Sequence, residues 1–292
     1  MLLRIVSILF PLFAITALGF VVARRQRPDL SQANQLNMGV FTPALIFAAL
    51  AAKDVDLRAY APLAVATFLL MAGSGAVGWL VARAFGIAPK TLVPPMMFNN
   101  CGNLGLPLAV LAFGHEALAP MVVMFAVANT LHFSFGIWLM DHHAKLATVW
   151  MTPSVLAVLA GLAVSLGGVT VWPPLWLAIK MVGDIAVQLM LFALGVRLAT
   201  AQISAVGFGV LGAVLRPVAG MALAWLLLQL CDLPERERAL LLVFGALPPA
   251  VLNFMFAERY RQEPEKVASM VLIGNLAALV SMPLALALAL PG

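Results

Sequence analysis

The chain has 292 residues, of which 63% are hydrophobic and 10% charged, and its formal net charge is +5. Soluble domains are roughly half apolar and one quarter charged, so the excess apolar surface of this chain must face lipid. This composition excludes an intrinsically disordered chain, a secreted disulfide-rich domain and a soluble cytosolic enzyme.

Ten apolar segments are long enough to cross a bilayer, because a hydrocarbon core of ~30 Å needs about 20 helical residues. In chain order they are residues 3–23, 32–52, 60–84, 92–114, 118–140, 153–171, 175–199, 205–230, 239–257 and 267–290. Every connector is short, and glycine, proline or charged residues mark the boundaries. The sequence therefore predicts an all-α integral membrane protein with ten transmembrane helices.

Basic residues are unevenly divided between the two sides of this predicted bundle. The loops after the odd-numbered spans hold Arg24, Arg25, Arg27, Arg83, Lys90, Lys145, Arg197, Arg259, Arg261 and Lys266, and the opposite loops hold Arg4, Lys53, Arg58, Arg236 and Arg238. The richer side is expected to be cytoplasmic, so both termini are predicted to lie outside. The basic excess thus indicates topology, and no nucleic-acid partner is expected.

Landmarks in the first half of the chain recur in the second half. Residues 43–47 resemble residues 188–192, and the pairs Pro107 with Pro248 and Asn129 with Asn275 are each separated by close to half the chain. Because each half holds an odd number of spans, two copies would insert with opposite orientations. Residues 1–145 and 146–292 are therefore interpreted as two inverted five-helix repeats. Chance similarity between apolar helices is the alternative.

Spans four and nine contain polar and helix-breaking residues at mid-membrane depth. Asparagine in hydrocarbon needs a partner, and glycine and proline weaken a continuous helix. A broken helix exposes N–H groups at a half-helix N-terminus, and these groups attract an anion such as a carboxylate. A Pro-kinked helix pair with interhelical Asn hydrogen bonds is the alternative. The candidate substrate-binding residues are Asn99, Asn100, Asn103, Asn253, Asn129 and Asn275, and the candidate hinge residues are Gly102, Gly105, Pro107, Gly245, Pro248 and Pro249.

Residues 99–108 and 247–260, with 43–47 and 194–199, resemble the auxin efflux carrier family of bacterial and plant transporters. The resemblance covers essentially the whole chain. It implies a crossover fold in which broken helices four and nine cross near their prolines, with Asn100, Pro107, Pro248 and Pro249 lining the crossing. It also implies an organic-anion substrate held there, two bodies that move relative to each other, a homodimer and a location in the bacterial cytoplasmic membrane.

The resemblance is not complete. Bacterial members look like carriers of malate and related carboxylates, and plant members carry auxin, an indole carboxylate. Helix seven has Gln188 where the family pattern leads us to expect a proline, and the chain lacks the long central loop of the large plant members. The missing loop argues against assuming auxin as the substrate.

Four further ionisable residues lie within spans. Asp184, near the middle of span seven, is a candidate ion-coupling carboxylate, and Lys180 lies one helical turn earlier. A plain Lys180–Asp184 pair between the two bodies is the alternative. His132 is either a proton relay or a hydrogen-bonded core histidine, and Arg216 either attracts an anion or snorkels to the interface.

No metal motif, phosphate-binding loop or catalytic pairing is present in the sequence, so we expect neither an enzyme nor a cofactor. The predicted function is a secondary transporter for a small organic anion, which works by alternating access at the broken helices. Proton coupling, sodium coupling and electrically driven uniport all stay open. The alternatives are a sodium-coupled symporter of bile-acid-carrier type and a non-transporting membrane sensor.

Overall fold

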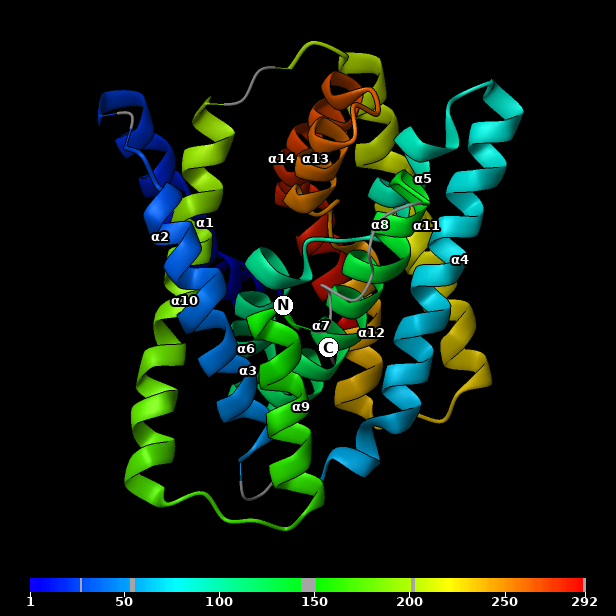
Figure 1. The fold of residues 1–292 in the computed structure, drawn as a ribbon. Helices are drawn as coiled ribbons and strands as arrows, with labels where there is room; N and C mark the ends of the chain where they lie inside the picture. Colours follow the sequence, from blue (N-terminus) through cyan, green and yellow to red (C-terminus); the bar gives the residue numbers. More distant parts are fainter. Residues whose placement is uncertain (27, 53–55, 143–150, 201–202, 291–292) are drawn as a thin grey trace.

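The computed structural model describes residues 1–26, 28–52, 56–142, 151–200 and 203–290 (Figure 1). Within these residues all regular elements are helices, apart from one isolated bridge between two chain segments. Seven helical stretches are long and apolar enough to cross a membrane: Leu2–Gln26, Ser31–Leu50, Leu57–Phe85, His115–Met140, Pro173–Thr200, Val206–Leu230 and Pro264–Ala289. The prediction of an all-α integral membrane protein is confirmed.

Four of these stretches are single α-helices, or nearly so: α1 (Leu2–Gln26), α10 (Pro173–Thr200), α11 (Val206–Leu230) and α14 (Pro264–Ala289). A short 3₁₀ turn, η2 (Leu57–Tyr60), precedes α4 (Ala61–Phe85). The other two are composite. The second span consists of α2 (Ser31–Leu36), η1 (Asn37–Phe41) and α3 (Thr42–Leu50), and the fifth of η4 (His115–Ala117), α7 (Leu118–Leu131), η5 (His132–Gly136) and α8 (Ile137–Met140).

Three predicted spans do not form one long helix in the described residues. The fourth is divided into α5 (Pro89–Met97), η3 (Cys101–Gly105) and α6 (Leu106–Phe113), and the ninth into α12 (Glu235–Ala246) and α13 (Val251–Arg259). The sixth, α9 (Pro153–Leu166), ends before the predicted residue 171. The cause is Gly168, whose φ of +64° places it in the left-handed region that terminates helices.

The helices pack in two groups (Figure 1). In the first, called the α10 group, α1 packs along α10, and α3 packs on both α9 and α10. In the second, called the α11 group, α11 packs on α4, α12 and α14, while α4 also packs on α5 and α7. The groups meet where α10 contacts η3 and α3 contacts α7. The interrupted spans four and nine therefore belong to the α11 group and face the α10 group.

Large apolar side chains cover much of the outer surface. Leu3 on α1, Trp225 on α11 and Leu288 on α14 are 83%, 63% and 70% exposed. Such a surface would be unfavourable in water but matches a hydrocarbon environment. The buried residues instead surround the interrupted helices, where Phe98 and Phe244 are almost completely enclosed. The interrupted backbone of these helices is thus covered by protein, which a non-helical backbone within a membrane requires.

Candidate functional site

Two extended stretches, residues 98–100 and 247–250, interrupt the fourth and ninth spans and lie against each other. Asn99 and Pro249 form an antiparallel bridge. The Asn100 N–H donates to the Pro248 carbonyl at 2.8 Å, and the Ala250 N–H donates to the Phe98 carbonyl at 3.0 Å. Pro248 and Pro249 have no N–H to donate, and each restricts the residue before it to extended backbone. Each break thus satisfies backbone groups of the other.

Four asparagine side chains hold this crossing. Asn253 Nδ2 donates to the Phe98 carbonyl at 2.9 Å, and Asn275 Nδ2 donates to the Pro249 carbonyl at 3.1 Å. Asn100 Nδ2 donates to Asn275 Oδ1 at 2.7 Å, and Asn99 Nδ2 donates to the Phe244 carbonyl at 2.7 Å. All four asparagines are buried. These bonds join the two broken spans to each other and to α14.

Arg216 on α11 lies behind the crossing and is 0% exposed. Its Nη1 donates to the Gly245 carbonyl at 2.8 Å, near the C-terminus of α12. A cation is favourable at a helix C-terminus, where carbonyl groups lack partners. Of the two alternatives for Arg216, snorkelling to the membrane interface is wrong, because the side chain is completely enclosed.

Gly220 lets α11 approach α12 at this point. A Cβ on Gly220 would lie 1.9 Å from the Gly245 carbonyl oxygen and 2.4 Å from Arg216 Nη1. A real Cβ cannot occupy that space, and the nearest obstacle is backbone. The close helix contact and the arginine cap therefore depend on each other.

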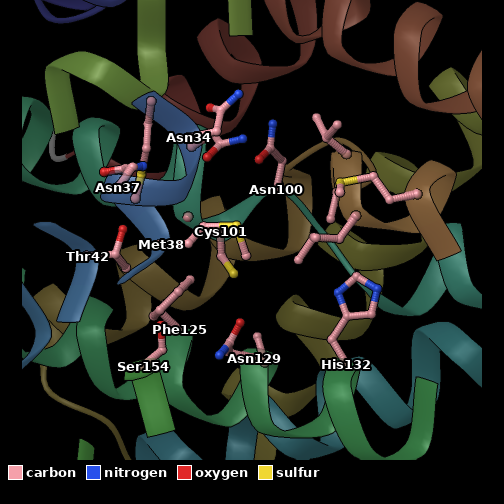
Figure 2. Close-up of a pocket in the computed structure, with 18 of the residues that line it drawn as sticks. Asn34, Asn37, Met38, Thr42, Asn100, Cys101, Phe125, Asn129, His132 and Ser154 are labelled. Carbon is pink, nitrogen blue, oxygen red and sulfur yellow. The ribbon is translucent and has the colours of Figure 1, made fainter. Parts of the chain in front are cut away.

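A cavity of about 420 Å³ opens between the crossing and the α10 group (Figure 2). In the figure, Asn37 and Thr42 of the second span lie on one side and His132 on the other, while Asn100 and Asn129 lie between them. Polar side chains from both groups line it: Asn34, Asn37, Thr42, Asn99, Asn100, Asn103, Asn129, His132, Ser154 and Arg197. A cavity of this size suits a small ligand.

Two half-helix N-termini border this cavity. The segment that begins at Cys101 continues through α6, and α13 begins at Val251; both of these first residues line the cavity. The first N–H groups of a helix have no intrahelical partner and carry partial positive charge. An anion in the cavity would therefore meet two such termini from opposite broken spans.

Three π-helical turns also surround the cavity. They are η1, η3 and η5, and residues of each line the cavity, such as Met38, Gly102 and Phe133. π-helical turns are rare and occur frequently at functional sites. Their convergence on one cavity, from three different spans, marks it as the candidate site.

The predicted binding residues divide into two sets. Asn99, Asn100, Asn103 and Asn129 line the cavity, whereas Asn253 lies at the crossing and Asn275 borders a neighbouring cavity. Neither Asn103 nor Asn129 makes a side-chain hydrogen bond within the described residues, so their amides face the cavity without partners.

The predicted hinge residues also divide. Gly102 lines the cavity, Pro248 and Pro249 form the crossing, and Gly245 packs against Gly220. Gly105 is buried against Met121 and Leu247. Pro107 lies in the first turn of α6, beyond the extended stretch, at a position where a helix tolerates proline. The first break therefore forms at residues 98–100, before the proline.

The candidate coupling residues lie in contrasting surroundings. The Asp184 carboxylate pairs with Lys180 Nζ on the same helix at 2.7 Å, and both side chains are partly exposed. His132 is buried, stacks on Phe98 with 4.1 Å between ring centroids, and has no hydrogen-bond partner at Nε2 among the residues that the structure describes. Of the two, only His132 lines the crossing cavity.

Sequence reasoning missed several lining residues from the α10 group. Asn34, Asn37 and Thr42 lie in an apparently ordinary span, and Arg197 was interpreted only as a cytoplasmic charge. The Asn34–Asn37 spacing, which places both side chains on one helix face, was the available signal. No set of three or more His, Cys, Asp or Glu residues within the described ranges could hold a metal ion.

Comparison with known proteins gives two matches. The sequence model of a family described as "Membrane transport protein" matches residues 4–152 and 145–286. A protein of Rhizobium meliloti (strain 1021) named "Putative malonate transporter" is 26% identical over 304 aligned residues, which cover 96% of this chain and 94% of that protein.

Proposed function

This chain belongs to the membrane transport protein family, as its resemblance to auxin efflux carriers predicts, and from this premise we propose a secondary carrier that binds a small carboxylate at the crossing. The observation that carries the proposal is the cavity of about 420 Å³ beside the two breaks. Two half-helix N-termini and the unpartnered amides of Asn103 and Asn129 border it. Together they offer donors to an anion without a bound metal.

The proposed architecture is two inverted five-helix repeats with spans four and nine as crossover helices. The packing supports this, because several helix–helix contacts have a counterpart between the equivalent helices of the other repeat. α1 with α10 corresponds to α9 with α3, and α4 with α5 corresponds to α11 with α12. α4 with α7 corresponds in the same way to α11 with α14. The break at Asn99 opposite Pro249 lies where two such repeats would meet.

The proposed mechanism is alternating access by movement of the α11 group against the α10 group. Pro153 and Arg197, from the ends of α9 and α10 that the charge pattern assigns to the cytoplasm, line the cavity. On the proposed orientation, with both termini outside, this supports an inward-open state. Because the bonds at the crossing lie within the α11 group, that group can move as one body.

We take malonate as the first substrate to test, because the relative from Rhizobium meliloti carries that name. Purified protein is reconstituted in liposomes, and uptake of labelled malonate is measured under imposed proton, sodium and voltage gradients. Transport under one of these gradients, saturable with malonate concentration, is the expected result. Absence of flux together with ligand binding would indicate a sensor, and strict sodium dependence would indicate a sodium-coupled symporter.

The site itself is tested with Asn103→Ala and Asn129→Ala. Removing one amide donor is expected to raise the KM for uptake several-fold, because a hydrogen bond contributes about 0.5–1.5 kcal/mol. Gln188→Ala is the matched control, since Gln188 is polar, exposed on α10 and absent from the cavity lining. If both asparagine variants transport like the control, the cavity is not the binding site.

A further inference from the structure

Arg197 lines the crossing cavity from the end of α10. Among the described residues that line the crossing cavity, it is the one that carries a fixed charge. It lies in the last turn of α10 and is only partly exposed. Its guanidinium group has neither an ion pair nor a hydrogen bond within the described ranges. An unpaired arginine beside a cavity has its donors available for a ligand.

A second cavity, of about 560 Å³, lies on the other side of Arg197. The two cavities share Arg197, Val251 and Met255, so these residues form the boundary between them. Glu258 and Glu265 line the second cavity, whereas no acidic side chain among the described residues lines the first. Coulomb interactions thus favour an anion on the crossing side of Arg197 and disfavour it on the other side.

The donors of the crossing and Arg197 belong to different helix groups. Asn103 and the N-terminus of α13 belong to the α11 group, and Arg197 belongs to the α10 group. A ligand with one carboxylate offers one anionic group to these two sets of donors. A ligand with two carboxylates offers one to each set.

We propose that Arg197 sets the charge specificity of the carrier by binding a second anionic group of the substrate, while the crossing binds the first. This inference rests on the proposed transport function. Arginine suits this role because its planar fork of donors forms paired hydrogen bonds with a carboxylate. The bridge also connects the two helix groups, so a dianion stabilises the loaded cavity more than a monoanion does.

The competing explanation is that Arg197 only retains the end of α10 on the cytoplasmic side, as many basic residues do. Arg83 provides the matched control. It also lies in the last turn of a spanning helix, α4, but it is exposed, stacks on Trp79 at 5.7 Å from the ring centroid, and lines neither cavity.

The experiment compares malonate with monomethyl malonate, which has nearly the same shape and one negative charge fewer. Uptake of both is measured in proteoliposomes for the wild type, Arg197→Gln and Arg83→Gln. In Arg197→Gln the KM for malonate is expected to rise about tenfold or more, because a charge-assisted hydrogen bond is lost. The KM for monomethyl malonate is expected to stay unchanged, and Arg83→Gln should match the wild type for both substrates.

Arg197→Lys keeps the positive charge but loses the planar set of guanidinium donors. Its KM for malonate should therefore rise less than that of Arg197→Gln, and its KM for monomethyl malonate should again stay unchanged. This variant preserves the contrast even where Arg197→Gln does not fold. An unchanged malonate preference in both Arg197 variants would overturn the inference while leaving transport intact, as would an equal effect of Arg83→Gln. Absence of carboxylate transport by the wild type would overturn the proposed function and this inference together.

Discussion

Asn253 and Asn275 at the crossing are buried and donate to backbone carbonyls, whereas Asn103 and Asn129 on the cavity wall make no side-chain hydrogen bonds within the described residues. The two pairs hold corresponding places in the two proposed repeats. Asn103 and Asn253 are each the third residue after a break, and Asn129 and Asn275 each lie in the last span of a half. The same residue type therefore holds the structure together at Asn253 and Asn275 and faces the cavity at Asn103 and Asn129.

This difference follows from the burial and hydrogen-bond partners of each side chain, because the residue type is the same. An amide enclosed by protein must find a partner, and the free carbonyls of a broken helix supply one. An amide beside a cavity can leave its donors to a ligand. The crossing should therefore respond to substitution through stability, and the cavity wall through transport. The following tests proceed from the largest expected effect to the smallest.

The close contact between Gly220 on α11 and Gly245 on α12 should be the position where a substitution lowers stability most. Gly220→Ala is expected to lower stability by about 1–3 kcal/mol, because the new methyl group would overlap the Gly245 carbonyl. Thermal unfolding in detergent measures the loss. Gly207→Ala on the same helix is the control, since no atom of the described residues lies within 4 Å of its added Cβ. Equal unfolding midpoints for the two variants would show that α11 and α12 can separate without cost.

Asn253→Ala and Asn103→Ala compare corresponding positions directly. The first should lower stability by about 1–3 kcal/mol, because two buried hydrogen bonds, from Asn253 Nδ2 to the Phe98 and Ala250 carbonyls, are lost. The second should leave the unfolding midpoint unchanged and weaken uptake. Unfolding and malonate uptake are measured on the same preparations. A stable Asn253→Ala, or an unstable Asn103→Ala, would contradict the roles assigned to these two asparagines.

A double-mutant cycle tests the bond that joins the fourth span to α14. Asn100→Ala and Asn275→Ala are expected to show a coupling of about 0.5–1.5 kcal/mol in unfolding free energy, because each is the other's hydrogen-bond partner. The cycle of Asn100→Ala with Asn129→Ala is the control and should give a coupling near zero. Additive effects in the first cycle would mean that the bond contributes nothing.

The smallest effect is expected outside both regions, at the loop before α14. Lys266 and Thr91 donate to the Glu263 carboxylate and hold its pKa below the ordinary 4.5. A lowered folded pKa gives stability that is present above the unfolded pKa and lost as pH falls through the folded value. Because Glu263 is partly exposed, Glu263→Gln should lower stability at pH 7 by less than about 1 kcal/mol.

The measurement for Glu263→Gln is the unfolding midpoint of wild type and variant from pH 7 to pH 3. The two midpoints should converge as the wild-type carboxylate becomes protonated. Malonate uptake should be the same in both proteins. A difference that persists at low pH would show that the carboxylate charge is not the cause.

Much of the candidate site followed from its residue types. Asparagine, glycine and proline at mid-membrane depth predicted the two interruptions, and four of the six predicted asparagines line the cavity. The position of the first break was not predictable in the same way. Pro107 indicated a break near itself, but a helix accepts proline in its first turn, and the chain instead extends at Asn99, where Pro249 bridges to it. Only the partner segment determines that choice.

By itself, the sequence determined that the chain is an all-helical membrane protein and that its fourth and ninth apolar segments are interrupted, because these features depend on local composition. Tertiary structure decided which asparagine side chains form hydrogen bonds and which face the cavity without a partner among the described residues. It also decided why Arg216 is buried at a helix end and that Arg197 faces the crossing cavity. These features depend on contacts between residues far apart in the chain. Residue spacing determines which face of a helix a side chain occupies, but only packing determines what that face meets.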